Sequence, residues 1–240
     1  MPATYSLSGK TILLSGATGQ VGTALAKALV STGTQVAAAV RKRWQVEPVE
    51  KILAGAKHLV GLVAATDSEA AAGLVKGAED SLGPIDAFIS VAGAFQFAAA
   101  GEDKAPDTYQ LLEANFLSVV TLARALIGPM RRRQAGNLVF TGASAVGSAA
   151  PGIPGMSSYL ASKAALHAWA CCVHEELKTQ GVRVVVITPG VIDTHSNRTA
   201  MPDADHASWL PIPAVVDTLL AAAAGERGYE GPLFDLPAQG

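Results

Sequence analysis

The chain has 240 residues, of which 50% are hydrophobic and 16% are charged, and its formal net charge is −2. This composition supplies a large apolar core and excludes an intrinsically disordered chain. The weak net charge argues against nucleic acid or an anionic membrane surface as a partner. We also expect no membrane-spanning helix, because no apolar run approaches roughly 18 residues. No linker divides residues 1–240, which predicts a single domain.

Short apolar runs alternate with longer helical patterns along the chain. Strands are expected at residues 11–15, 35–40, 58–63, 87–91, 137–142, 182–188 and 232–236, and helices at 20–31, shortly after a loop at 41–48, and at 67–82, 107–133, 157–180 and 212–224. Apolar strands that alternate with helices are typical of a parallel sheet covered on both faces. The pattern predicts an α/β fold, a doubly wound (Rossmann) sheet of about seven strands that binds ligands at the carboxyl ends of its strands.

A glycine-rich turn, SGATGQVG, joins the first strand to the first helix at residues 15–22. Glycines at such a junction permit a tight turn and the close approach of a diphosphate, which the free N–H groups of the helix N-terminus then bind. The alternative is an ordinary glycine-rich turn. We predict a dinucleotide site, and the candidate contacts in the turn are Gly16, Thr18, Gly19, Gln20, Val21 and Gly22.

The end of the second strand indicates which dinucleotide binds. An acidic residue there would accept hydrogen bonds from the adenosine ribose of NAD(H), but this chain has Val40, followed by Arg41, Lys42 and Arg43. Arginine suits a 2′-phosphate because its guanidinium can donate two parallel hydrogen bonds. A solvated basic loop is the alternative. The pattern favours NADP(H) over NAD(H), with Arg41 and Lys42 as contacts.

Tyr159 and Lys163 stand four residues apart in the helical run SYLASKAAL, so their side chains share one helix face. An ammonium beside a phenol favours the phenolate and is expected to lower the pKa of the tyrosine. The pair is therefore predicted to act as a general acid or base near neutral pH.

The two cysteines, Cys171 and Cys172, are neighbours in the chain, and such neighbours rarely form a disulfide. The first ten residues lack the charged-then-apolar pattern of an export signal. Together these features predict a cytoplasmic protein with reduced thiols. The five histidines have no spacing typical of a metal site, so we expect no metal.

These motifs, in this order, resemble the short-chain dehydrogenases/reductases over nearly the whole chain. The Tyr-x-x-x-Lys pair of that family matches Tyr159 and Lys163, and its glycine turn matches residues 15–22. Its other motifs correspond to Val91-Ala92-Gly93 after the fourth strand, to the helical asparagine Asn115, and to Pro189-Gly190 after the sixth strand, with Thr194 following.

The resemblance implies hydride transfer between nicotinamide and a carbonyl or alcohol carbon of a small molecule. Tyr159 would give its proton to the carbonyl oxygen, Lys163 would hold the nicotinamide ribose, and Asn115 would hold a water in a proton relay. Gly93 would keep the backbone close to the cofactor, and Thr194 would bond its carboxamide or diphosphate. The further cofactor contacts that the family pattern implies are Ala92, Pro189, Gly190 and Ile192.

Some positions depart from the family pattern. The serine that fixes the carbonyl oxygen is assigned to Ser144, which begins a Ser-x-x-Gly pattern, although counting along the strand from Gly136 places Ala143 there. Val91 replaces the asparagine whose carboxamide braces the central strand. Asp67 is the candidate for the aspartate that contacts adenine, and a cap of the next helix is the alternative.

The segment from about 190 to 211 is expected to form a substrate lid. Within it, residues 193–198 and 201–209 resemble the corresponding region of quinonoid dihydropteridine reductases, a divergent branch of the same family. A reductase of such a quinonoid substrate is therefore the alternative to a carbonyl reductase or alcohol dehydrogenase. The alternative from another class is a catalytically silent dinucleotide sensor.

The candidates for the wall of the substrate pocket are Phe95, Phe97, Met156 and Trp209, and ordinary packing is the alternative for each. Members of the family commonly associate through the helices that flank the fifth strand. The resemblance therefore implies a homodimer or homotetramer.

Overall fold

The computed structural model describes residues 6–102, 104–147 and 152–237. At its centre lies a seven-stranded sheet with the order β3-β2-β1-β4-β5-β6-β7, in which every neighbouring pair is parallel. The strands are β1 Thr11–Ser15, β2 Gln35–Val40, β3 His58–Leu62, β4 Ile85–Ser90, β5 Gly136–Thr141, β6 Val182–Pro189 and β7 Leu233–Leu236. All seven predicted strands are confirmed, each within two residues of its expected bounds.

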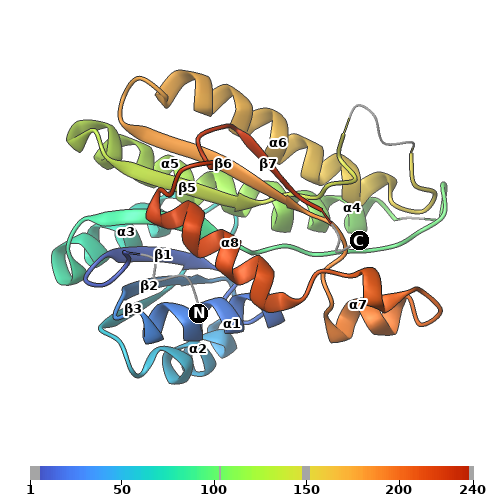
Figure 1. Ribbon diagram of the computed structural model, residues 1–240, viewed down its shortest axis with the longest axis horizontal. Helices are drawn as coiled ribbons and strands as arrows, with labels where there is room; N and C mark the ends of the chain where they lie inside the picture. The colour runs from blue at the N-terminus through green and yellow to red at the C-terminus, as the bar shows by residue number, and fades with distance from the viewer. Residues whose placement is uncertain (1–5, 103, 148–151, 238–240) are drawn as a thin grey trace.

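Helices cover both faces of the sheet (Figure 1). One face carries α1 Gln20–Ser31, α2 Val46–Leu53 and α8 Ile212–Ala224, and the other carries α3 Ser68–Leu82, α5 Ser118–Arg133 and α6 Ser157–Leu177. Successive side chains of a strand point to opposite faces. Leu13 of β1 accordingly packs into the core beneath α3, α5 and α6, whereas Ile12 and Leu14 pack beneath α1, α2 and α8.

The strand order reverses at β1, since β2 and β3 lie on one side of it and β4 to β7 lie on the other. In doubly wound sheets this reversal opens a crevice at the carboxyl ends of the two central strands, where ligands bind. In this chain the segments that leave β1 and β4 there are the glycine turn and residues 91–93.

The helices depart from expectation in three places. The loop expected at 41–48 is wrong from Arg43 onward, because these residues form the 3-10 turn η1 Arg43–Gln45 and the start of α2. Pro48 is accommodated because the first turn of a helix needs no N–H donors. Residues expected as one helix form α4 Ala105–Leu112, the π turn η2 Glu113–Leu117, and α5. The lid contains α7 His195–Ala200 and the 3-10 turn η3 His206–Ser208, which are too short to give a periodic pattern.

The helical run Asp107–Arg133 has the length and mean hydropathy of a membrane-spanning helix, contrary to the expectation that no such run exists. This run is interrupted by polar residues, which its mean hydropathy tolerates. Half of the most apolar stretch of this run is buried inside the domain, where α5 packs against α3 and the sheet. Its apolar side chains thus form part of one of the two cores.

Candidate active site

Two of the three glycines in the turn after β1 have no room for a side chain. Gly16 has a φ of +88°, and a Cβ there would lie 2.5 Å from the backbone nitrogen of Ala92. A Cβ on Gly22 would lie 1.9 Å from the carbonyl oxygen of Gly16. Gly19 has an ordinary φ of −75°, and its Cβ would lie 3.5 Å from the same oxygen. The turn therefore brings the backbone of β1, α1 and the segment after β4 into direct contact.

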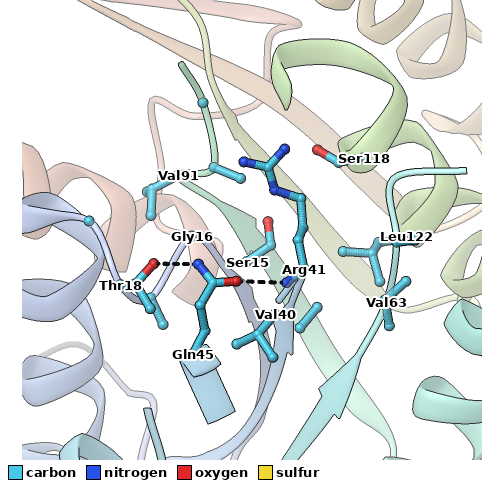
Figure 2. A pocket seen from close by; sticks show the side chains of 16 residues that line it. Ser15, Gly16, Thr18, Val40, Arg41, Gln45, Val63, Val91, Ser118 and Leu122 are labelled. Atoms are coloured by element: carbon cyan, nitrogen blue, oxygen red, sulfur yellow. Dashed lines mark hydrogen bonds between the residues drawn. The ribbon is translucent and has the colours of Figure 1, made fainter. Parts of the chain in front are cut away.

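An open cleft runs along the carboxyl ends of β1, β2 and β4 (Figure 2). Six predicted cofactor contacts line it, namely Gly16, Thr18, Gly19, Arg41, Ala92 and Gly93. Val40, Val63 and Leu122 give it apolar sides, which suit a planar base. The bare glycine backbone at the N-terminus of α1 suits a diphosphate. The residues present therefore fit a dinucleotide.

The other predicted contacts lie outside the lining of this cleft within the described chain: Gln20, Val21, Gly22, Lys42, Asp67, Tyr159, Lys163, Pro189, Gly190, Ile192 and Thr194. Gly22 acts through packing on Gly16. Asp67 caps α3, because its carboxylate accepts a hydrogen bond from the N–H of Ala70 at 2.9 Å. Of the two roles that the sequence left open for Asp67, the structure therefore shows the helix cap.

Gln45 ties the end of β2 to the glycine turn, a contact that the sequence analysis missed. Its side-chain oxygen accepts hydrogen bonds from the N–H groups of Arg41 and Lys42 at 3.0 and 2.8 Å. Its Nε2 donates to the hydroxyl of Thr18 at 3.0 Å. From this fixed backbone the Arg41 side chain reaches over the cleft (Figure 2). The arrangement supplies a cation at the end of β2, where Val40 offers no carboxylate.

A pair of hydroxyls braces β1 against β4 next to the cleft. The Ser15 hydroxyl donates to that of Ser90 at 2.8 Å, and the N–H of Val91 donates to the carbonyl of Ser15 at 3.1 Å. Val91 offers no carboxamide to brace the central strands. The structure shows that bracing is instead provided one residue earlier, by Ser90.

Tyr159 and Lys163 lie one turn apart on α6, next to the inner end of the cleft. Lys163 is buried, its Nζ donates to the carbonyl of Thr141 at 2.8 Å, and it lies 3.5 Å from where a Cβ of Gly93 would be. The Tyr159 ring meets the Phe95 ring edge-on, with centroids 5.0 Å apart. The helix thus carries both side chains on one face and brings the Lys163 ammonium next to Gly93 of the cleft lining.

Burial dominates the titration of this pair. It lowers the pKa of Lys163 to about 8 and raises the pKa of Tyr159 to about 12. The expected lowering of the Tyr159 pKa is therefore wrong for the protein alone, because burial disfavours the phenolate and the ammonium is directed at the Thr141 carbonyl. At neutral pH Tyr159 is a protonated phenol, which is the form that can donate a proton.

Asn115 is completely buried in the π turn, a feature that often marks functional sites. Its Oδ1 accepts from the N–H of Ala94 at 2.8 Å, and its Nδ2 donates to the Ala94 carbonyl at 2.9 Å and to the Ser162 hydroxyl at 2.8 Å. The hydroxyl of Ser162, a residue that sequence analysis missed, in turn donates a hydrogen bond to the Tyr159 carbonyl at 2.6 Å. The amide thus braces the turn after β4 against α6, and its role in a water relay stays a prediction.

The segment that follows β5 presents one buried and one exposed candidate for the serine position. Ala143 is 8% exposed, whereas Ser144 is exposed and is held by a hydrogen bond from its N–H to the Pro189 carbonyl at 3.1 Å. A hydroxyl on the exposed residue is accessible to a substrate, so Ser144 stays the candidate.

His167 lies on α6 one turn beyond Lys163 and is 5% exposed. Its Nε2 faces the N–H of Ala143 at 3.4 Å and occupies the space that a Cβ on Gly142 would need, at 2.2 Å. An Nε2 that accepts a hydrogen bond requires a neutral ring. Burial, followed by the charge of Lys163, lowers the pKa of His167 to about 4, against an opposing effect of Asp235.

The pKa of His167 predicts a loss of stability in mild acid. The folded pKa of about 4 lies below the ordinary value of 6.5, so the unfolded chain takes up the proton first. The contribution of the neutral ring to stability is fully present above pH 6.5 and is lost as the pH falls toward 4. At pH 5 the loss of unfolding free energy amounts to about 2 kcal/mol. Urea unfolding at pH 7 and pH 5 measures it. The same pH dependence in a His167→Gln variant would contradict this assignment.

Residues 190–211, the predicted lid, form a loop that is closed at its base. Ile192 and Leu210 form an isolated bridge, and the N–H of Asp193 donates to the Leu210 carbonyl at 2.8 Å. Arg198 donates two hydrogen bonds to the Asp193 carboxylate, at 2.5 and 2.8 Å. The lid is therefore a braced unit rather than an extended strap.

The lid is tied to the glycine turn by Gln20, whose side-chain oxygen accepts the N–H of His195 at 2.8 Å. Thr194 caps α7, since its hydroxyl accepts the N–H of Asn197 at 3.2 Å, so that hydroxyl is already engaged within the lid. Trp209 is 7% exposed and packs against His206 with ring centroids 4.3 Å apart. Gly190 donates its N–H to the Leu236 carbonyl at 3.0 Å, which anchors the lid to β7.

Comparisons with known proteins agree with this architecture. Residues 10–205 match the family model described as short chain dehydrogenase. Curated relatives include the 3-oxoacyl-(acyl-carrier-protein) reductase FabG of Haemophilus influenzae, 28% identical over 78% of this chain and 76% of its own length. The FabG of Salmonella typhimurium is 26% identical over 87% of this chain and 84% of its own length.

The chain matches only a small part of another relative, Glycine betaine reductase ATRR of Emericella nidulans. The two are 28% identical over 77% of this chain, which is 14% of that protein. Among solved structures, an NAD⁺-bound xylitol dehydrogenase superposes with a TM-score of 0.84 over 98% of this chain and 100% of its own, at 21% identity. At that identity the likeness shows the fold.

Proposed function

The chain belongs to the short chain dehydrogenase family of NAD(P)-dependent oxidoreductases, and on that premise we propose that it transfers hydride between NADP(H) and a carbonyl or alcohol group of a small molecule. The observation that carries the proposal is the position of Lys163. Its Nζ lies 3.5 Å from where a Cβ of Gly93 would be, and Gly93 lines the nucleotide cleft. The place of Lys163 beside the cleft, one helical turn from Tyr159, supports the assignment of this pair to the reaction.

A bound nicotinamide cofactor supplies or accepts the hydride. The residues of the chain manage the proton: Tyr159, with a pKa raised to about 12, donates its hydroxyl proton to the carbonyl oxygen as that oxygen becomes an alkoxide. Lys163, with a pKa of about 8, is a cation at neutral pH and favours the phenolate that this step leaves behind. Ser144 would orient the carbonyl oxygen, and Asn115 would keep α6 at a fixed distance from the cofactor.

The direct test is consumption of NADPH and NADH, followed at the absorbance band of reduced nicotinamide, with a panel of ketones, aldehydes and quinones. We expect NADPH to be oxidised only when a carbonyl compound is present and Tyr159 is intact. Cofactor binding without turnover of any compound would favour the dinucleotide sensor.

The cofactor preference rests on Arg41. An Arg41→Ala variant is expected to bind NADPH about 10- to 100-fold more weakly, because a charge-assisted contact to the 2′-phosphate is lost. Its affinity for NADH should change little. Titration of each reduced cofactor by nucleotide fluorescence measures both constants.

Lys42→Ala is the matched control for Arg41→Ala, because Lys42 is the neighbouring cation and does not line the cleft. It should weaken NADPH binding less. Equal affinities of the unmodified protein for NADPH and NADH would refute the preference for NADP(H).

The reduction of a quinonoid pterin-like substrate is an alternative that rests on the sequence of the lid. The panel tests it directly if quinonoid dihydropterin is included. Preferential turnover of that compound, with either cofactor, would replace the carbonyl reductase assignment.

We further propose a cytoplasmic homodimer or homotetramer that associates through α5 and α6. These two helices lie on the same face of the sheet (Figure 1). On α6 small side chains, including Ala161, Ala168 and Cys172, are exposed, which allows helices to approach closely. Light scattering coupled to size-exclusion chromatography gives the mass of the assembly, and a monomer would refute this part of the proposal.

A further inference from the structure

Three large apolar side chains in the segments that follow β4 and precede α6 are exposed, and one of them, Phe95, packs on Tyr159. Phe95 contacts the Tyr159 ring edge-on, with centroids 5.0 Å apart. Phe97 covers Gly155, where an added Cβ would lie 2.4 Å from the phenyl ring. The N–H of Ala98 donates to the Gly155 carbonyl at 2.9 Å, which joins the segment after β4 to the segment before α6. We call Phe95, Phe97 and Ile153 the apolar wall.

The apolar wall faces solvent although its side chains are large. Phe95 is 43% exposed, Phe97 is 65% exposed and Ile153 is 41% exposed. Exposing such groups together is unfavourable in water, and clustered exposed apolar side chains mark a binding surface. Because Phe95 packs on Tyr159, the proposed proton donor, we expect a substrate to bind at this surface with its reacting group next to Tyr159.

The sequence around the wall carries no charge. No Asp, Glu, Lys, Arg or His occurs between residues 87 and 101, or between residues 134 and 158. In the lid, the Arg198 guanidinium is already paired with the Asp193 carboxylate. A carboxylate or phosphate on the substrate would therefore lose its hydration at the wall without gaining a cation from these segments or from Arg198, and the Lys163 ammonium is buried and donates to the Thr141 carbonyl.

We propose that the substrate is an uncharged aromatic ketone or aldehyde whose ring packs on Phe95 while its carbonyl oxygen meets the Tyr159 hydroxyl. This inference rests on the proposed function and names its substrate class. Aromatic rings attract one another edge-on beyond the effect of buried area. The wall therefore favours a substrate that carries a ring next to its carbonyl group.

The test for charge compares methyl 4-acetylbenzoate with 4-acetylbenzoate, which carry the same ketone on the same ring. We expect kcat/KM with NADPH to be about 10-fold or more higher for the neutral ester, because burial of the unpaired carboxylate is costly. An equal or higher value for the carboxylate would overturn the inference.

The test for aromaticity compares acetophenone with cyclohexyl methyl ketone in the unmodified protein and in Phe95→Ala. The variant should reduce kcat/KM for acetophenone about 5-fold more than for the saturated ketone, which lacks the ring–ring contact. Tyr109→Ala removes another exposed aromatic side chain, from α4, and serves as the control that should leave the ratio unchanged. If the ratio of kcat/KM for acetophenone to kcat/KM for the saturated ketone is unchanged in Phe95→Ala, the wall does not select aromatic substrates.

Binding separates failure of this inference from failure of the proposed function. Calorimetric titration of the ester and the carboxylate into the protein saturated with NADP⁺ requires no turnover. Tighter binding of the ester that is lost in Phe95→Ala supports the inference even if no ketone is reduced. Tyr159-dependent turnover that prefers the carboxylate overturns the inference and leaves the oxidoreductase intact.

Discussion

A Tyr159→Phe variant is expected to lose about a thousandfold in kcat while it binds NADPH as tightly as the unmodified protein. The change removes one hydroxyl, which is the proton donor, and keeps the ring that packs on Phe95. The remaining Lys163 ammonium still donates to the Thr141 carbonyl and still lies beside the cleft. Steady-state rates with a reducible ketone, together with fluorescence titration of NADPH, measure the two quantities.

Unchanged turnover in Tyr159→Phe would disprove the role of the phenol as the proton donor. A parallel loss of NADPH binding would instead point to a folding defect, which circular dichroism distinguishes. Ser144→Ala is the companion variant. It should lower kcat less than Tyr159→Phe, because Ser144 would orient the oxygen without supplying the proton, and full activity would show that Ser144 is not the family's serine.

A Gly22→Ala variant is expected to lose about 3 kcal/mol of unfolding free energy, at the upper end of overpacking effects. Its new Cβ would lie 1.9 Å from the Gly16 carbonyl oxygen, so either α1 or the glycine turn must move. In a domain of this size the loss corresponds to a decrease in Tm of about 6–12 °C. Displacement of the turn should also weaken NADPH binding, which titration of the folded variant measures.

Gly19→Ala provides the matched control within the same turn. Its Cβ would lie 3.5 Å from the Gly16 carbonyl oxygen, and its φ of −75° suits any residue. We expect a change in unfolding free energy below about 1 kcal/mol. Equal destabilisation by the two substitutions would show that glycine flexibility, rather than close packing of α1 on the turn, governs this segment.

The parts of the fold and site that sequence analysis predicted correctly are those with a strong local signal. The strands are continuous apolar runs, which the two cores require, and the glycines of residues 15–22 mark the turn after β1. Tyr159 and Lys163 could be placed on one face because helical spacing alone determines it.

The contacts that sequence analysis missed join segments far apart in the chain. Gln45 meets Thr18, and Ser162 meets Asn115, across separations of 27 and 47 residues. A single glutamine or serine carries no periodic signal, so only the assembled sheet reveals such partners. The pKa of Tyr159 was predicted in the wrong direction for the same reason, since burial is a property of the packed structure.

The pairing of β1 with β4 has a consequence for the folding equilibrium. The hydrogen bond between Ser15 and Ser90 joins residues that are 75 apart in the chain, and the close approach of Gly16 to Ala92 joins the same two segments. A nucleotide in the crevice between them binds the folded chain and has no site on the unfolded one. At a hundred times its Kd such a ligand adds about 2.7 kcal/mol to the free energy of unfolding. The fraction of this protein that is folded, and its resistance to proteolysis, therefore rise with the concentration of nicotinamide nucleotide around it.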